Sequence, residues 1–218
     1  MSAFQITVYT DTICPWCYIG HKSMDRAIDL YKTTYPGGSQ DEFVFTYLPY
    51  YLDPNAPEKG IPWPERVAQK SGADKVNAIR TRLQRVGRAN GIEFNFDSKI
   101  GKTRDSQRLL QHVLQTRGNA AHKILLEEIY QEHFEQDCDI TSHADLTRAA
   151  VRAGLPEEEV TAFLASDALS SEVDALAAES RQKGVNSVPT YEVNGKRINV
   201  EGAGDPSEFL EALIACRQ

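Results

Sequence analysis

Apolar and polar positions near the start of the chain change from alternation to a helical spacing. Residues 4–10 alternate apolar with polar side chains and are rich in β-branched and aromatic residues, which predicts a strand. From Met24 to Tyr31 the apolar residues recur at helical spacing, and the helix should end before Pro36. Residues 42–49 are apolar on both faces, which predicts a strand in the interior of a covered sheet. This order predicts a βαβ unit with parallel strands.

The middle of the chain has helical spacing almost throughout, from about residue 65 to residue 166. Asn90-Gly91, Gly118 and Gly154 each end one apolar stripe, as a C-terminal glycine does in a helix. We expect these stripes to be core faces. The basic positions of the first stripe's helix should form a solvated face; they are Arg80, Arg82, Arg85 and Arg88.

Strand character returns near the end of the chain. Residues 185–193 and 196–200 flank Asn194-Gly195, the strongest short signal for a β-hairpin. Asp205-Pro206 then supplies an N-cap and a first-turn proline for a last helix. The pattern predicts an α/β protein in which residues 1–60 and 167–218 form one domain and residues 61–166 form an inserted helical domain.

Composition narrows the set of partners. The chain has 218 residues and a formal net charge of −7, which favours neither a nucleic acid nor an anionic membrane as partner. It has no apolar run of the ~20 residues that a membrane helix needs, and its first residues do not resemble a signal peptide. Four cysteines, two of them without a neighbour, fit a reducing compartment. We therefore expect a cytoplasmic protein without nucleic-acid or membrane partners.

Two cysteines mark the predicted transition from the first strand to the first helix, in the segment Cys14-Pro15-Trp16-Cys17. The N–H groups and dipole at a helix N-terminus favour a thiolate, so Cys14 should be the nucleophile and face outward. Pro15 fits the first turn, where its missing N–H costs nothing. Cys17, one turn further on and buried, should resolve a mixed disulfide formed at Cys14. The spacing therefore predicts thiol–disulfide exchange.

A zinc site and a structural disulfide are two other possible uses of the pair. A zinc site usually has a second pair of ligands at matching spacing, whereas the remaining cysteines, Cys138 and Cys216, each stand alone. A purely structural disulfide over so short a loop constrains the unfolded chain little. We therefore expect no metal, redox chemistry at the pair, and inert thiols at Cys138 and Cys216.

The chain resembles the DsbA-like thioredoxin superfamily, and within it the FrnE-like group. Cys14-Pro15-Trp16-Cys17 after a first strand, a helical insertion, and Gly184-Val185-Asn186-Ser187-Val188-Pro189-Thr190 carry this resemblance over essentially the whole chain. It implies a thioredoxin-like fold, with Cys14 as nucleophile and Cys17 as resolving cysteine. It also implies that Pro189 is a cis-proline packed against the disulfide and that the backbone of Val188 pairs with an extended substrate.

Three further positions belong to the expected site. Asp11 matches a position that is often acidic in the resembled group; it would either accept a proton from Cys17 or cap the strand-to-helix turn. Trp16 is expected to be exposed between the sulfurs, where it would tune the potential or contact substrate, with Pro15 as support. The sequence departs from the resembled group at the start of an insertion helix, where Lys102-Thr103 and Ser106-Gln107 replace an Asn-Thr…Ala-His motif.

The expected function is a thiol–disulfide oxidoreductase acting on protein or small-molecule disulfides and dithiols. We expect no tightly bound cofactor, glutathione as the candidate co-substrate, and a monomer or homodimer. The alternative is a glutathione-dependent isomerase or transferase, similar to 2-hydroxychromene-2-carboxylate isomerase and the kappa-class transferases, which usually keep a serine in place of Cys14. A third hypothesis is a non-catalytic module that binds peptides along the Val188 edge.

Overall fold

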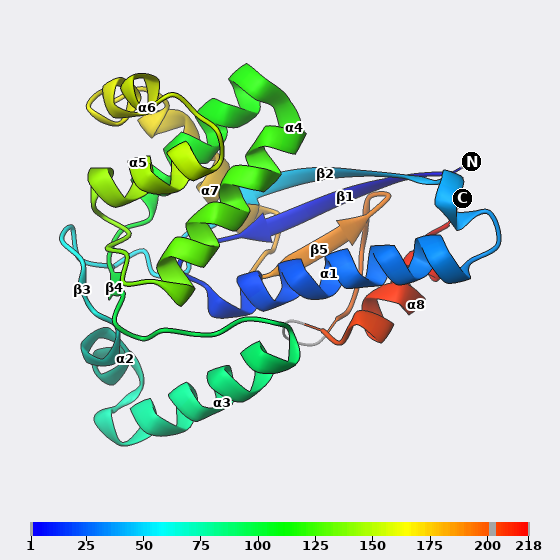
Figure 1. Cartoon of the computed structure of the whole chain (residues 1–218), viewed down its shortest axis with the longest axis horizontal. Helices are drawn as coiled ribbons and strands as arrows, with labels where there is room; N and C mark the ends of the chain where they lie inside the picture. Colours follow the sequence, from blue (N-terminus) through cyan, green and yellow to red (C-terminus); the bar gives the residue numbers. More distant parts are fainter. Residues whose placement is uncertain (1, 201–203, 218) are drawn as a thin grey trace.

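A computed structural model describes residues 2–200 and 204–217 of the chain. Its main sheet, within these ranges, has the strand order β2-β1-β5-β6. Figure 1 shows β2, β1 and β5 of this sheet. The strands are β1 (Ala3–Thr10), β2 (Glu42–Pro49), β5 (Thr190–Val193) and β6 (Lys196–Arg197). β1 pairs parallel with β2, while β5 pairs antiparallel with both β1 and β6. The predicted α/β class and the parallel βαβ unit are confirmed.

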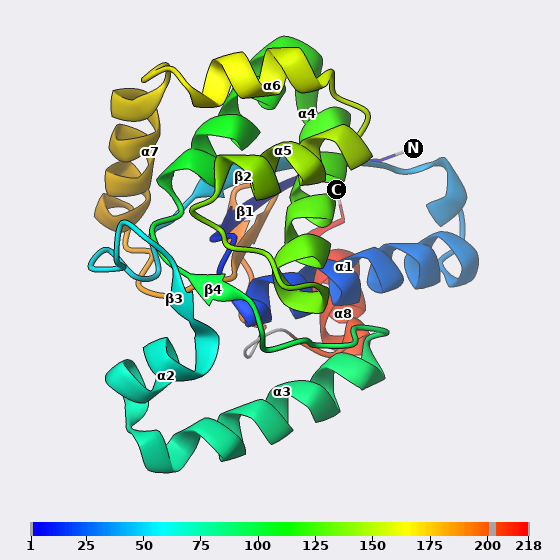
Figure 2. The same cartoon turned by 60° about the vertical axis from the view of Figure 1, so that its left-hand side comes forward.

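Helices pack on this sheet and extend well beyond it. They are α1 (Pro15–Thr34), α2 (Trp63–Ser71), α3 (Val76–Ala89), α4 (Arg104–Glu135), α5 (His143–Arg152), α6 (Glu157–Leu164), α7 (Ser170–Gln182) and α8 (Pro206–Cys216). A two-residue antiparallel pair, β3 (Ile61–Pro62) and β4 (Lys99–Ile100), joins the loops around α2 and α3. Figure 2 shows the beginning of α1 between α4–α6 on one side and α2–α3 on the other. The first turn of α1 is therefore enclosed by the inserted helices.

Strand β2 lies at the edge of the sheet, so the prediction of an interior strand was wrong. Its apolar residues are covered by helices instead of by a further strand, since α4 and α7 both pack on β2. Lysine stems complete this cover: the ammonium of Lys32 lies 5.4 Å from the ring centre of Phe43, and that of Lys123 lies 4.9 Å from the ring centre of Phe45. An edge strand apolar on both faces is thus compatible with a sheet covered on both sides.

Two glycines end a helix and form a turn at the positions that the sequence predicts. Helix α4 is interrupted at Gly118, whose φ of 81° takes it out of the helical region. At the hairpin, Asn194 and Gly195 have φ values of 52° and 74°, and Val193 pairs with Lys196 across the turn. The strand before the turn begins only at Thr190, so residues 185–189 form an irregular segment that leads into the sheet.

One apolar core runs through both parts of the chain. It joins Phe4 and Ile6 of the sheet to Leu109 and Leu126 of α4. The predicted boundaries between the two domains therefore stay a prediction. In the described ranges, no helix is both long enough and apolar enough to cross a membrane.

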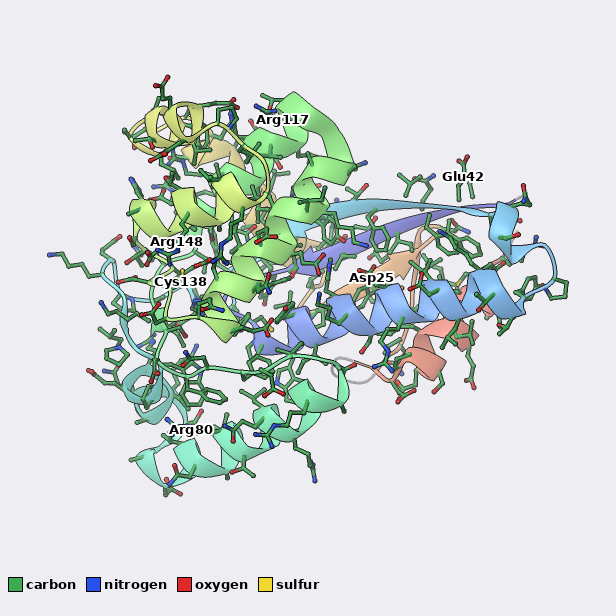
Figure 3. All side chains as sticks on the ribbon, in the orientation of Figure 1. Asp25, Glu42, Arg80, Arg117, Cys138 and Arg148 are labelled. Atoms are coloured by element: carbon green, nitrogen blue, oxygen red, sulfur yellow. The ribbon has the colours of Figure 1, made fainter. Side chains whose placement is uncertain are left out.

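The basic face of α3 is only partly solvated. Arg82, Arg85 and Arg88 are exposed, whereas Arg80, labelled in Figure 3, is half-buried. Its guanidinium lies 5.3 Å from the ring centre of Phe96.

Candidate active site

The cysteine pair lies where strand β1 passes into helix α1. Cys14 is the N-cap residue of α1 and has extended backbone angles, and Pro15 occupies the first turn, as predicted. The N–H of Cys17 donates to the carbonyl oxygen of Cys14 at 3.0 Å, which places the two cysteines one turn apart. Both are free thiols.

A segment 174 residues away in sequence completes the site. The thiol of Cys14 donates to the carbonyl oxygen of Val188, with an Sγ–O distance of 3.5 Å. The peptide bond between Val188 and Pro189 is cis. The structure therefore brings together four of the predicted site residues, Cys14, Cys17, Val188 and Pro189.

Both sulfurs are buried, and the prediction of an outward-facing Cys14 was wrong. Only 1% of Cys14 and 2% of Cys17 is exposed. Tertiary packing causes this burial. Ile13 and Val188 belong to the same apolar cluster as the two cysteines, and the Val188 carbonyl contacts the thiol of Cys14. An exposed thiol at a helix N-terminus is a local expectation, which this packing overrides.

The thiol of Cys17 is enclosed by the protein. Burial, together with the neighbouring Cys14, raises the pKa of Cys17 well above its ordinary value. A hydrogen bond with the side chain of Thr10 and one with the backbone of Asp11 partly oppose this shift. Thr10 Oγ1 in turn lies 2.5 Å from the hydroxyl oxygen of Tyr130 on α4. The proton of Cys17 is therefore held tightly in the thiol form.

The carboxyl group of Asp11 is buried in the turn that precedes the helix. Its Oδ2 accepts a hydrogen bond from the N–H of Leu52 at 2.7 Å. Burial raises the pKa of Asp11 from 3.8 to about 6, against the lowering effect of hydrogen bonds from Leu52, Thr103 and the backbone of Ile13. These contacts tie the turn to the loop that follows β2; the capping role and the proton-accepting role both stay predictions.

Replacing Asp11 with asparagine should stabilise the protein at neutral pH and leave it unchanged near pH 4. Because the folded-state pKa of about 6 exceeds the ordinary 3.8, the folded protein holds a proton that the unfolded chain loses between these values. The contribution of Asp11 to the free energy of unfolding therefore falls as pH rises through this window, by about 1–3 kcal/mol. Urea unfolding of both proteins at pH 4 and pH 7.5 checks this. A stability difference that does not change with pH would contradict it.

The first turn of α4 forms hydrogen bonds with the residues that precede Cys14. Thr12 Oγ1 lies 2.8 Å from Ser106 Oγ, and the amide of Gln107 donates to the carbonyl oxygen of Thr10 at 3.3 Å. Ser106 and Gln107 belong to the segment that departs from the resembled group. Here they position the backbone just before Cys14.

Trp16 is half-buried, so the prediction of an exposed indole was wrong. It packs against the apolar core, and the guanidinium of Arg82 on α3 lies 4.8 Å from its ring centre. Pro15 and Trp16 line a cavity of about 310 Å³ between the cysteine turn and helices α2 and α3. The two residues between the cysteines therefore face this cavity.

Three tyrosines around Cys17 had no signal in the sequence, whereas His21, one turn after Cys17, was expected to be a solvated surface histidine or to influence the charge of the site. His21, Tyr47, Tyr130 and Tyr191 line a small chamber together with Cys17. His21 is buried near Asp25 and Glu127, so the expectation of a solvated histidine was wrong. The tyrosines come from elements that are distant in the sequence.

The other two cysteines lie outside the site. Cys138 is buried near Arg148, next to α5 (Figure 3), and burial raises the pKa of its thiol to about 12. Cys216 is the last residue of α8 and is partly exposed. Within residues 2–200 and 204–217, no group of three His, Cys, Asp or Glu side chains could hold a metal ion.

Comparison with known proteins identifies the fold family. The family model of the DSBA-like thioredoxin domain matches residues 5–214. The chain belongs to this family. The predicted thioredoxin-like fold and the DsbA-like membership are confirmed, while the FrnE-like branch stays a prediction. No curated protein sequence matches the chain.

Solved structures of DsbA-like proteins share the fold along nearly the whole chain. A probable DsbA oxidoreductase from Streptomyces coelicolor has 28% identity and a TM-score of 0.83, with 98% of this chain and 89% of that chain covered. The cytosolic disulfide reductase DsbM from Pseudomonas aeruginosa has 16% identity and a TM-score of 0.63, with 97% of each chain covered. A 2-hydroxychromene-2-carboxylate isomerase has 13% identity and a TM-score of 0.68, with 97% and 93% covered. The last two show a shared fold alone.

Proposed function

We propose that this protein is a thiol–disulfide oxidoreductase in which Cys14 and Cys17 exchange disulfides with substrate through a mixed disulfide. The observation that carries the proposal is the pair itself: two free thiols one helical turn apart at the N-terminus of α1, with Cys14 against the Val188 carbonyl. A nucleophilic sulfur and a second sulfur within reach of it are the two requirements of the exchange.

The overall exchange transfers two electrons: one sulfur–sulfur bond breaks in the substrate and one forms in the protein. When a substrate disulfide is reduced, the Cys14 thiolate attacks one substrate sulfur, the substrate S–S bond breaks, and the other substrate sulfur leaves as a thiolate. Cys17 then gives its proton to the first substrate thiolate or to solvent and attacks Cys14 Sγ, which forms the Cys14–Cys17 disulfide and releases the second substrate thiolate. A substrate dithiol is oxidised by the same steps in reverse.

Burial of Cys14 sets a structural requirement for this chemistry. The attacking and leaving sulfurs must lie in line with Cys14 Sγ, which is covered next to the Val188 carbonyl. The proposal therefore includes an opening of the contact between Cys14 and Val188 when substrate binds. The same carbonyl then becomes free to accept a hydrogen bond from an extended substrate backbone.

We also propose glutathione as a co-substrate and a cytoplasmic location. The likeness to a probable DsbA oxidoreductase supports the reaction class. DsbM, named a cytosolic disulfide reductase, also has a structure with GSH, which supports the compartment and the co-substrate. The intact cysteine pair favours exchange over the isomerase alternative.

Equilibration with mixtures of reduced and oxidised glutathione tests the proposed function. The pair should form one intramolecular disulfide with a reduction potential between about −120 and −270 mV, the range of proteins with this fold. Mass spectrometry after alkylation counts the free thiols at each ratio. A protein that keeps four free thiols at every ratio, or forms a disulfide through Cys138 or Cys216, would contradict the proposal.

A further inference from the structure

The cavity beside the cysteine turn has the size and lining of a small-molecule site. Its volume of about 310 Å³ lies at the lower end of the range of ligand pockets. Pro15 and Trp16 face it from the turn that carries the sulfurs, and Trp63, Val67 and Ile79 face it from α2 and α3. Aromatic and aliphatic groups thus surround a space suited to a single ring.

Charge around this cavity is positive, although the whole chain is negative. Its lining includes three cations, Arg66, Lys70 and Arg82, and one carboxylate, Asp53. Asp53 is already paired: Arg66 Nη2 lies 2.7 Å from its Oδ2, and Lys70 Nζ lies 3.2 Å from its Oδ1. One carboxylate therefore faces three cations, which leaves the lining with an excess of two positive charges.

Arg82 is the cation that is not committed to a protein carboxylate. Its guanidinium lies over the ring of Trp16, and among the described residues it forms no ion pair. It lies on an exposed face of α3, at the side of the cavity that adjoins Trp16. A carboxylate on a ring stacked in the cavity would meet Arg82 and stay within reach of the cysteine turn.

We propose that this cavity binds the body of a small aromatic disulfide or thiol that carries a carboxylate, and presents its sulfur to Cys14. The inference rests on the proposed function and names its substrate class. The ring packs among Trp16, Trp63 and Val67, and the carboxylate pairs with Arg82. After the contact with the Val188 carbonyl opens, Cys14 gives up its proton and attacks one aryl sulfur, the aryl S–S bond breaks, and the other aryl sulfur leaves as a thiolate. Cys17 then gives up its proton and attacks Cys14 Sγ, which forms the protein disulfide and releases the second aryl thiolate; the two protons pass to solvent or to the leaving thiolates.

Three disulfide probes separate shape from charge. They are 5,5′-dithiobis(2-nitrobenzoate), which is aromatic and anionic, 4,4′-dithiodipyridine, which is aromatic and neutral, and cystamine, which is aliphatic and cationic. The reduced protein, with Cys138→Ala and Cys216→Ser in all samples, reacts with each probe in a stopped-flow instrument. Each rate constant is divided by that of a reduced Cys-Pro-Trp-Cys peptide, which removes intrinsic reactivity. The enhancement should be largest for the nitrobenzoate and smallest for cystamine.

Variants then assign the effect to the cavity. Arg82→Gln should lower the rate with the nitrobenzoate by roughly three- to tenfold, because one local charge affects the association of an anionic probe by about this much. It should change the rate with dithiodipyridine, which is neutral, by less than about twofold. Val67→Trp fills the cavity and should lower the rates with both aromatic probes. Arg85→Gln, an exposed arginine on the same helix, is the matched control and should change neither rate.

The outcomes distinguish this inference from the proposed function. Equal effects of Arg82→Gln and Arg85→Gln on the nitrobenzoate, or an enhancement for cystamine equal to that for the aromatic probes, would overturn the substrate class while exchange at Cys14 persists. Absence of reaction at Cys14 with all three probes would overturn the proposed function itself.

Discussion

Replacing Cys14 with serine should reduce disulfide exchange to the uncatalysed rate, a loss on the order of a thousandfold or more, because a hydroxyl does not replace a thiolate as nucleophile. The variant should fold normally, since serine is close in size to cysteine. The thiol of Cys14 donates to the Val188 carbonyl oxygen, and a serine hydroxyl is able to donate to the same oxygen. The substitution therefore keeps this hydrogen bond. The loss should therefore reflect chemistry and not a change in stability.

Two assays measure this loss: reduction of insulin by dithiothreitol, followed by turbidity, and reactivation of scrambled ribonuclease. Cys138→Ala and Cys216→Ser serve as matched controls and should retain the activity of the parent protein. Cys216 tests an accessible thiol and Cys138 a buried one. Full activity of Cys14→Ser in both assays would favour the hypothesis of a non-catalytic peptide-binding module.

Replacing Cys17 with serine should convert most of the protein into mixed disulfides with its substrate. Cys14 still forms the first bond, but the second sulfur, one turn away, is missing. Cys138 lies beside α5 and Cys216 at the end of α8, so neither occupies the position of Cys17. The first exchange step should thus proceed while the release step slows by about tenfold or more, to the rate of attack by external thiols.

Non-reducing electrophoresis followed by mass spectrometry identifies the trapped adducts, with oxidised glutathione and with a disulfide-bonded peptide as separate probes. The double variant Cys14→Ser/Cys17→Ser is the control and should form none of them. If Cys17→Ser accumulates no more adduct than the parent protein, or if the adduct is attached at Cys216, the assignment of Cys17 as the resolving cysteine fails.

The sequence by itself determined the local parts of this fold and site. Alternation and helical spacing predicted β1, α1 and the helices around Gly118, because these periods follow from backbone geometry. The Asn194-Gly195 turn and the Asp205 cap were equally clear, since each depends on the residues in the turn itself. The placement of Cys14 at a helix N-terminus belongs to the same class of local prediction.

Only the tertiary structure decided what surrounds the two sulfurs. It brought Val188 to Cys14 and Tyr130 to Thr10, buried Cys14 where exposure was expected, and placed Arg82 over Trp16. It also put β2 at the sheet edge and covered it with helices. Each of these features depends on contacts between residues far apart in the chain. The free energy of such contacts comes from the packing of whole elements, which a local pattern of apolar and polar residues does not specify.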